Sequence, residues 1–423
     1  MRTRSGRAAS TLSSIGSSRS TRTSRRSCTH SRTSCPTSAD ARVRLAAPVS
    51  RLVPSVLAFD DIAHRVLERI ASDPDPFAAL DDDAPFDALA RAVFAFQYEA
   101  NLPYRAFCDR RGRTPDRVAR WQDVPALPTS AFKTVELACA APEKVFRTSG
   151  TAQGSERRGR HLVPRLELYR RGALAHFRRM VLPDGLRPRI VGLLGPPDLL
   201  PESSLAQMVE WLRLDVAGGH GEYLVDAAGF DAARAADRIA ELSRDGRPLC
   251  LIGVRVVFTA LLDHCLASRR VLELPADSRV VDTGGPKGGR TLSDAGFLAA
   301  CWRVLGVAGY HCVNEYGMTE LCSQYYDDTL AARWDGDSRP RRKVPPAWMR
   351  SVAVDPATLA PLPEGTTGLL CHVDLANAGS VMAVQTEDLG TVDRGRLQLL
   401  GRAPGAEPRG CALALADFLA ASP

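Results

Sequence analysis

The chain has 423 residues, of which 45% are hydrophobic and 24% charged, with a formal net charge of +7. This composition excludes a mainly disordered protein, and no apolar run reaches the roughly 18 residues that a membrane helix needs. The eleven cysteines form no C-x-x-C pair and no His/Cys cluster at metal-ligand spacing. We therefore expect reduced thiols in a cytoplasmic protein rather than a disulfide framework.

Residues 1–50 differ from the rest of the chain. They hold ten arginines and one acidic residue, Asp40, so they carry a charge of +9 and the remainder carries −2. Such a Ser/Thr/Arg-rich segment has too few large apolar residues to offset its ordering entropy. Three interpretations stay open: a start placed too far upstream, a disordered basic tail that contacts nucleic acid or anionic surfaces, and a transit peptide. Outside this tail we expect no nucleic-acid surface.

From about Val56 the sequence reads as a folded protein. Apolar residues at i, i+3 and i+4 spacing predict helices in 61–71 and 86–112. Further along, strands that end in turns alternate with helices, which favours a mostly parallel sheet covered by helices. The strands are predicted in 187–197, 248–254, 278–285 and 309–317, and the helices in 203–214, 230–246, 258–268 and 293–306.

After about residue 345 the pattern changes to short strands, in 349–355, 366–375, 380–390 and 395–401. We therefore predict an α/β protein in which a larger domain of parallel sheets covered by helices is followed by a smaller β-rich subdomain. The predicted division is a tail or misplaced start (1–55), a core (56–345), the β-rich subdomain (346–400) and a short C-terminal segment (401–423).

The first candidate site is the loop 148–155, TSGTAQGS. Glycines let the backbone turn several N–H groups toward one anion, and hydroxyls add donors. Arg157, Arg158 and Arg160 follow and supply positive charge for phosphates. The loop lacks the Gly-Lys-Ser/Thr of a Walker A sequence. By itself such a loop is more often an ordinary solvent loop than a phosphate site.

Further candidate residues lie at or near the ends of predicted strands, where ligands bind in open α/β sheets. An aromatic ring there can stack on a base, a threonine can reach a phosphate, and a glutamate can hold Mg²⁺. Taken alone, the DTGG and TED motifs are better explained as ordinary turns, and the NEYGMTE motif is equally consistent with an exposed polar loop. The motifs are DTGG with Gly284 and Gly285, NEYGMTE with Tyr316, Thr319 and Glu320, TED with Asp388, and GR with Arg402.

The order TSGT, TGG, EYGMTE, TED, GR resembles the motif series of the adenylate-forming superfamily. The stretches FQYEANLPYRAFC, VPALPTSAFKT and GRAPGAEPRGC make the chain most similar to the acyl-protein synthetases of bacterial luminescence (LuxE type, long-chain-fatty-acid–luciferin-component ligase), over residues 56–423. It is less similar to the phenylacetate-CoA ligases. The resemblance implies an adenylate-forming fold and a ligase that uses ATP and Mg²⁺ to convert a carboxylic acid, expected to be a long-chain fatty acid, into an acyl adenylate.

The resemblance also implies roles for individual residues. Tyr316 would stack on adenine, Thr319 would contact the α-phosphate, Glu320 would hold Mg²⁺, Asp388 would bind the ribose, and Arg402 would lie near it as the hinge-region arginine. Four residues would hold phosphates and two would line the adenine site: Thr148, Ser149, Gly150 and Thr151, and Gly284 and Gly285, respectively.

Two departures from the CoA ligases bear on the acyl acceptor. The lysine expected after the Thr-Gly of the phosphate loop is missing, and Arg157 or Arg158 would have to replace it. Only 21 residues follow Arg402, without a lysine, so we expect the full C-terminal swivelling domain to be absent. Cys411 lies in that short segment. In the acyl-protein synthetases a cysteine near the C-terminus takes the acyl group and passes it to a partner reductase, so the resemblance makes Cys411 the acceptor.

The residues leave alternatives open. Cys411 could be an inert thiol, with the acyl group released to CoA, or the protein could be a non-catalytic nucleotide sensor whose tail contacts nucleic acid. Cys322 is interpreted as lining a pocket, and the isolated His161 and His220 as structural residues. Cys139, Cys250, Cys265, Cys301 and Cys371 lie in apolar contexts and are predicted in the core. The identity of the acid, the final acyl acceptor and the oligomeric state are not predicted.

Overall fold

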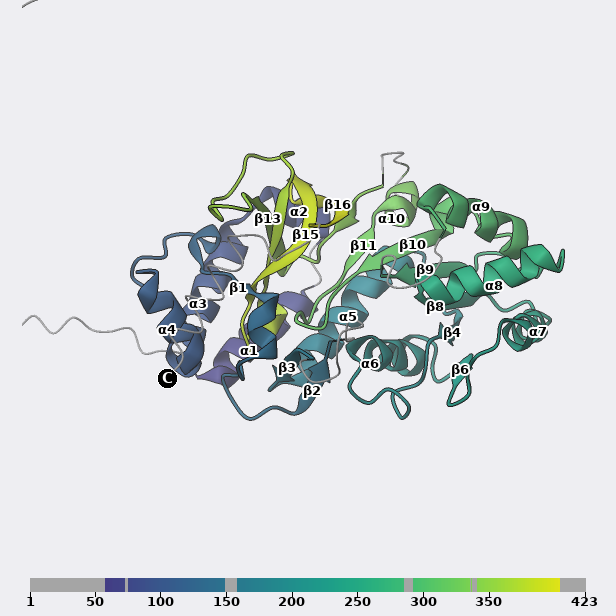
Figure 1. The fold of residues 1–423 in the computed structure, drawn as a ribbon, viewed down its shortest axis with the longest axis horizontal. Helices are drawn as coiled ribbons and strands as arrows, with labels where there is room; N and C mark the ends of the chain where they lie inside the picture. Colours follow the sequence, from purple (N-terminus) through teal and green to yellow (C-terminus); the bar gives the residue numbers. More distant parts are fainter. Residues whose placement is uncertain are drawn as a thin grey trace, which may run out of the picture. The chain divides into compact units, whose positions relative to one another are not determined.

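The computed structural model describes residues 58–72, 75–148, 158–284, 292–334, 336 and 341–403. Within these ranges the chain builds one twelve-stranded sheet and two small two-stranded sheets (Figure 1). The strands are β1 (Leu127–Pro128), β2 (Lys144–Arg147), β3 (Arg160–Val163), β4 (Arg189–Leu193), β5 (Gly221–Tyr223), β6 (Val225–Asp226), β7 (Gly229–Phe230), β8 (Leu249–Val254), β9 (Arg279–Thr283), β10 (Cys312–Tyr316), β11 (Tyr325–Asp327), β12 (Lys343–Val344), β13 (Met349–Val354), β14 (Gly368–Asp374), β15 (Ala383–Asp393) and β16 (Arg396–Arg402).

Helices lie on both sides of the large sheet. They are α1 (Phe59–Ala71), α2 (Pro76–Asp81), α3 (Ala84–Ala100), α4 (Leu102–Arg110), α5 (Leu166–Val181), α6 (Ser204–Trp211), α7 (Ala232–Leu242), α8 (Arg255–Ala267), α9 (Asp294–Leu305) and α10 (Thr329–Trp334). Short 3-10 turns include η2 (Thr129–Lys133) and η6 (Leu375–Asn377). No helix in the described ranges is both long and apolar enough to span a bilayer.

At β10 the strand pairing of the large sheet changes from parallel to antiparallel. On one side, β10 is followed by β9, β8, β4 and β5, all in parallel pairing. On the other side, β11, β12, β16, β15, β14 and β13 follow in antiparallel pairing. β10 therefore belongs to both halves, and its carboxyl end lies where parallel strand ends meet the antiparallel strands (Figure 1).

The parallel strands are buried on both faces because successive side chains point to opposite sides of a strand. Val191, Leu251 and Val280 belong to one apolar cluster with residues of α7, α8 and α9. Their neighbours along the same strands belong to a second cluster, which contains residues of α1, α3, α5 and α6; these neighbours are Ile190, Ile252 and Val281. The sheet thus separates two cores.

The alternation of strands and helices predicted from the sequence is confirmed, and local sequence explains several boundaries. Ser203 begins α6 by accepting a hydrogen bond from the Ala206 N–H at 3.2 Å. Asn101 separates α3 from α4 and caps α4 through Tyr104 N at 3.2 Å. Helix α5 was not predicted. The strands predicted after residue 345 are present as β13 to β16 and extend the same large sheet.

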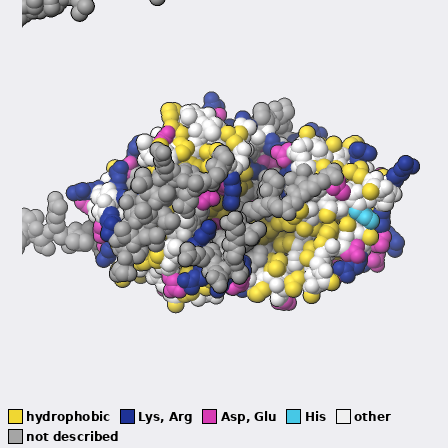
Figure 2. All heavy atoms as spheres, in the orientation of Figure 1, with side chains coloured by type: hydrophobic (Ala, Val, Ile, Leu, Met, Phe, Trp, Pro, Cys, Tyr) yellow, Lys and Arg dark blue, Asp and Glu magenta, His cyan; other side chains and the backbone are white. Residues whose placement is uncertain are grey.

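The surface matches the nearly neutral composition of the chain beyond residue 50. On the face drawn in Figure 2, Lys and Arg side chains are interspersed with Asp and Glu and are not gathered into one basic area.

Candidate functional site

The predicted residues of the NEYGMTE and DTGG motifs lie at the carboxyl ends of adjacent parallel strands. Tyr316 ends β10 and Gly284 directly follows β9. Gly284 has a φ of 77°, a left-handed conformation that glycine adopts without steric cost. After β10 the chain makes a tight turn, closed by Leu321 N and Met318 O at 3.2 Å, with Thr319 and Glu320 at its centre. This is the position at which an open α/β sheet binds ligands.

Tyr316, Asp388 and Arg402 come together although 72 and 14 residues separate them in sequence. The Tyr316 hydroxyl donates to Asp388 Oδ2 at 2.8 Å, and Arg402 Nε donates to Asp388 Oδ1 at 3.2 Å. Burial, and then the nearby Asp388 carboxylate, raise the pKa of Tyr316 well above its ordinary value, so the hydroxyl keeps its proton. Each oxygen of Asp388 has one such partner, and a carboxylate has further lone pairs to accept donors.

His372 on β14 contacts the hydroxyl of Tyr316. Its Nε2 lies 3.1 Å from the Tyr316 hydroxyl, and its Nδ1 lies 2.8 Å from Ser351 Oγ and 3.0 Å from the Tyr325 hydroxyl. Because the Tyr316 proton goes to Asp388, His372 Nε2 must carry the proton that it donates to Tyr316. Nδ1 is then the acceptor. Burial lowers the pKa of His372 to about 3, so this ring is neutral at pH 7.

The turn of Thr319 and Glu320 is held through its backbone. His161 Nδ1 lies 2.7 Å from Thr319 O, and Asn377 Nδ2 donates to Glu320 O at 2.9 Å. His161 Nε2 also lies 2.8 Å from Asn377 Oδ1. Burial lowers the pKa of His161 to about 4, against the opposing effect of these two oxygen partners. His161, interpreted from sequence as a structural residue, therefore contacts the predicted site directly.

The base of the predicted phosphate loop is tied together by Thr148, Arg158 and Glu202. Thr148 and Gly159 exchange hydrogen bonds across the loop base, and the Thr148 Oγ1 accepts from Gly159 N at 2.9 Å. Arg158 Nε donates to Thr148 O at 2.6 Å, and Arg158 pairs with Glu202 at 3.3 Å. Glu202 also pairs with Arg147 at 2.9 Å. In this structure Arg158 therefore holds the loop base.

Several predicted residues lie outside the described part of the chain. These are Ser149, Gly150, Thr151, Gly285, Arg157 and Cys411. The structure therefore leaves their roles as predictions, as it does the ligand roles of Thr148, Gly284, Tyr316, Thr319, Glu320, Asp388 and Arg402.

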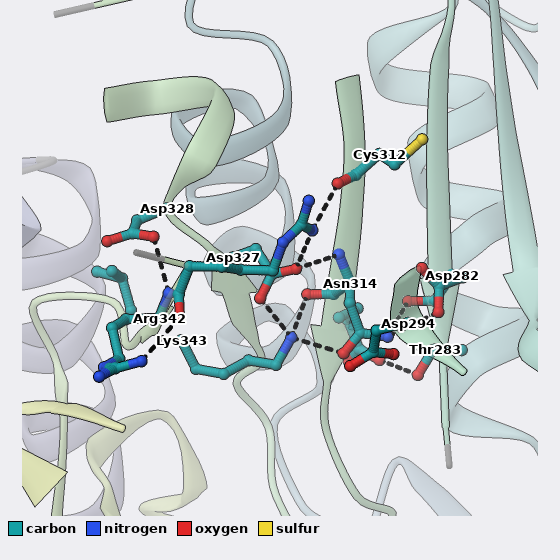
Figure 3. A network of polar contacts seen from close by, with 12 residues as sticks. Asp282, Thr283, Asp294, Cys312, Asn314, Asp327, Asp328, Arg342 and Lys343 are labelled. Carbon is teal, nitrogen blue, oxygen red and sulfur yellow. Dashed lines mark hydrogen bonds and ion pairs between the residues drawn. The ribbon is translucent and has the colours of Figure 1, made fainter. Parts of the chain in front are cut away.

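A second polar network lies beside the first, around Asn314 (Figure 3). Lys343 Nζ donates to Asn314 Oδ1 at 2.6 Å and pairs with Asp327 at 2.8 Å. Asn314 Nδ2 donates to Asp282 Oδ2 at 2.7 Å, and Arg255 Nε pairs with the same carboxylate at 2.5 Å. Burial by itself would raise the pKa of Asp327, yet Lys343 and Arg341 together lower it. This carboxylate therefore stays charged.

Glu315 and Cys322 are buried on either side of the turn. The Thr283 hydroxyl donates to Glu315, and burial raises the pKa of Glu315 to about 7. Cys322 is 1% exposed, and burial, followed by Asp374, raises the pKa of its thiol well above the ordinary value. A thiol that stays protonated is a poor nucleophile. Cys322 is thus poorly suited to accept an acyl group.

The other described cysteines are free thiols. Cys250, Cys265, Cys301 and Cys371 are buried, as predicted, and Cys139 is half-buried. Among the described residues, no group of three or more His, Cys, Asp and Glu side chains is arranged to hold a metal ion.

Sequence comparison identifies related proteins. Residues 56–420 match the family described as acyl-protein synthetase, LuxE. The chain is 23% identical over 355 residues to the long-chain-fatty-acid–luciferin-component ligase of Aliivibrio fischeri, which covers 79% of this chain and 88% of that protein. The ligase of the same name from Vibrio harveyi is 23% identical over 352 residues, with the same coverage of each chain.

Structural comparison gives the fold. 2-Hydroxyisobutyryl-CoA ligase with 2-HIB-AMP and CoA superposes with a TM-score of 0.53 at 14% identity, over 82% of this chain and 69% of that one. The open conformation of the same ligase gives a TM-score of 0.52 at 14% identity, over 75% of each chain. At this identity the likeness shows the fold alone, and it confirms the predicted adenylate-forming fold. Because the family match spans residues 56–420, the chain belongs to the acyl-protein synthetase family LuxE and is an enzyme of that family.

Proposed function

We propose that this enzyme activates a long-chain fatty acid with ATP and then carries the acyl group on Cys411. In the first step a carboxylate oxygen attacks the α-phosphorus, the bond to the β-phosphate breaks, and pyrophosphate leaves. In the second step the Cys411 thiolate attacks the acyl carbonyl carbon and AMP leaves. The thioester keeps the acyl group activated for delivery to a partner of the acyl-reductase class.

The main support for a nucleotide site is that Tyr316 and Arg402 both contact Asp388. Tyr316 and Asp388 are joined at 2.8 Å, so an adenine stacked on the ring would place its ribose hydroxyls near the carboxylate. Asp388 can accept ribose hydroxyls with the lone pairs that Tyr316 and Arg402 leave open. Gly284, which presents no side chain, leaves room for a flat base at the end of β9.

The phosphate end of the site would lie between the Thr319–Glu320 turn and the loop after Thr148. Mg²⁺ in nucleotide sites is held by one or two carboxylates together with phosphate oxygens, and Glu320 on this turn offers one carboxylate. The residues present therefore fit the ion. When bound, Mg²⁺ would neutralise phosphate charge as pyrophosphate leaves. Thr319, and the hydroxyls and N–H groups of residues 148–151, would orient the phosphates by donating hydrogen bonds.

The choice of Cys411 rests on family membership and on nucleophile chemistry. Cys322 lies close to the turn but is buried and keeps its proton. Cys411 follows Arg409 by two residues in the sequence, and a cation close to a thiol favours the thiolate.

Labelled fatty acid and ATP test both steps. We expect ATP-dependent, hydroxylamine-sensitive labelling of the intact protein, loss of that label in Cys411→Ser, and retained label in the matched thiol variant Cys322→Ala. Carboxylate-dependent pyrophosphate exchange should persist in Cys411→Ser, because adenylation precedes transfer. Equal labelling of Cys411→Ser and wild type would exclude Cys411 as carrier. Stoichiometric CoA thioester formation by Cys411→Ser would instead identify a CoA ligase.

A further inference from the structure

Both central carbonyls of the Thr319–Glu320 turn are bound by side chains from distant parts of the chain. Thr319 O is 2.7 Å from His161 Nδ1, and Glu320 O accepts from Asn377 Nδ2 at 2.9 Å. His161 Nε2 also lies 2.8 Å from Asn377 Oδ1, but the neutral ring has one N–H, so it donates to one of these two oxygens at a time. A turn whose two central carbonyls are both held has little freedom to shift its backbone.

The orientation of Asn377 is set by its neighbours. Its amide group donates to Val381 O at 2.8 Å as well as to Glu320 O, so Oδ1 is the atom that faces His161. The backbone of Asn377 is held in turn by Gln97 of α3, whose Nε2 donates to Asn377 O at 3.0 Å. His161 and Asn377 are 1% and 2% exposed, respectively, and polar groups buried this deeply keep their hydrogen-bond partners.

His161 connects this turn to the hairpin that bears the predicted phosphate loop. It lies on β3, which pairs antiparallel with β2 in the register Phe146 opposite His161. Its ring and that of Phe132 pack edge to face, with centroids 5.9 Å apart and an interplanar angle of 81°. Because the ring is fixed in the hairpin and reaches the turn, a shift of one segment must be transmitted to the other.

The η6 turn also contacts the residues that directly follow the Thr319–Glu320 turn. Asp374 accepts hydrogen bonds from Cys322 N at 2.9 Å and from Ser323 Oγ at 2.7 Å. The same carboxylate accepts from Ala376 N at 3.0 Å and so caps η6. Asn377, at the end of η6, is therefore attached to the turn both directly and through Asp374.

We infer that His161 and Asn377 are positioning residues that hold the Thr319–Glu320 turn in register with the β2–β3 hairpin, so that the phosphate-binding groups of the two segments act on the same phosphate. The inference rests on the proposed function. Neither side chain needs to touch the substrate, because each acts through a carbonyl of the turn. Loss of the contacts that His161 and Asn377 make with the turn should therefore impair the adenylation step. It should affect the binding of adenine and ribose less, because that binding depends on Tyr316 and Asp388.

The test compares pyrophosphate exchange in the full-length protein, with ATP, Mg²⁺ and a panel of long-chain fatty acids. His161→Phe keeps the ring volume and the contact with Phe132 but removes both nitrogens. We expect its kcat for exchange to fall about 10- to 100-fold, as is typical when a group that orients a metal or phosphate ligand is lost, with the KM for ATP within about threefold of wild type. His161→Gln, which can still donate to Thr319 O, should recover part of the loss. His220→Gln, a change at an exposed histidine, is the control.

Circular dichroism and thermal unfolding of each variant show whether it is folded. If His161→Phe does not fold, Asn377→Asp, which keeps Oδ1 and loses the donor to Glu320 O and Val381 O, carries the same test. A folded variant with wild-type kcat, a loss confined to KM, or a loss that His161→Gln does not reduce would overturn the inference alone. Wild-type protein that gives no exchange with any acid would overturn the proposed function itself, and the inference with it.

Discussion

Asn314 and Tyr316 are two residues apart on β10, and each belongs to a buried polar network, but the two networks differ in how fully their charges are paired. Around Asn314, the cations Arg255, Arg341 and Lys343 contact the carboxylates of Asp282, Asp294 and Asp327. Around Tyr316, one carboxylate, Asp388, contacts a hydroxyl and a single arginine whose side chain is 55% exposed.

The difference separates a network that the protein pairs by itself from one that, under the proposed function, would also bind a ligand. Lys343 uses its donors on Asn314 O, Asn314 Oδ1 and Asp327 Oδ1, so the first network is closed by the protein itself. Asp388 lies at the rim of the second network, next to a side chain that solvent reaches. Buried ions with complete partners hold strands together, whereas a carboxylate with spare lone pairs at a strand end can accept ligand hydroxyls.

The largest effect is expected for Lys343→Met, which removes the cation from the closed network. Among the described residues Asp327 would keep one ion-pair partner, Arg341, so the loss should lie near the lower end of the roughly 3–5 kcal/mol that leaving a buried charge unpaired costs. Urea unfolding should show this loss in the free energy of unfolding. Arg342→Met, the same type of change at the half-buried neighbour, should cost less than about 1 kcal/mol. Equal losses in the two variants would contradict a structural role specific to Lys343.

A smaller effect, on catalysis rather than on the fold, is expected for Asp388→Asn. Removing the charge that would receive ribose hydroxyls should lower kcat/KM for ATP about 10- to 100-fold, in line with hydrogen bonds to charged groups. Steady-state pyrophosphate exchange measures the change. Asp393→Asn, at the exposed end of the same strand, should leave kcat/KM unchanged. If Asp388→Asn lost stability like Lys343→Met and kept its kcat/KM, the contrast between the two networks would be wrong.

The smallest effect is a pH dependence of stability due to His372. Its pKa is about 3 in the folded protein and about 6.5 when unfolded, so only the unfolded state takes up this proton between those values. Above pH 6.5 His372 does not change the free energy of unfolding with pH. As the pH falls below 6.5, protonation of the unfolded state lowers the free energy of unfolding, by about 2 kcal/mol at pH 5.

His372→Gln isolates that contribution, because the other buried histidines titrate in both proteins. The stability advantage of wild type over His372→Gln should shrink by about 2 kcal/mol between pH 8 and pH 5, as measured by urea unfolding. A difference that stays constant over this range would mean that His372 is charged, or exposed to solvent, in the folded protein.

The sequence predicted the order of strands and helices and the family, because strand-end motifs and hydrophobic periodicity are local signals. It also named Tyr316, Asp388 and Arg402, which the fold brings into contact. It did not single out His372, Ser351 or Tyr325, since their contacts depend on the register of antiparallel strands that are distant in sequence. The ligand roles and the division into domains stay predictions.

The supports of the turn were missed for a related reason. Asp374 and Asn377 lie in a short stretch, DLANAGS, that resembles an ordinary polar loop, and each is fully or almost fully buried only because α3, β3 and the turn close over it. His161 likewise has no local signal beyond its place six residues after the predicted loop 148–155. Polar residues in a loop flanked by strongly apolar strands were the one available indication.

The end of β16 sets a limit on how Cys411 can be used. Ala403, which donates from its N–H to Glu387 O at 3.0 Å, leaves the sheet directly beside Asp388 and Arg402. Seven residues lie between Ala403 and Cys411, so the tether spans at most about 30 Å even when fully extended. Under the proposed function, a thiol on so short a tether would meet the adenylate at an effective concentration of about millimolar. Acyl loading should accordingly be first order in protein and insensitive to the thiols dissolved around it.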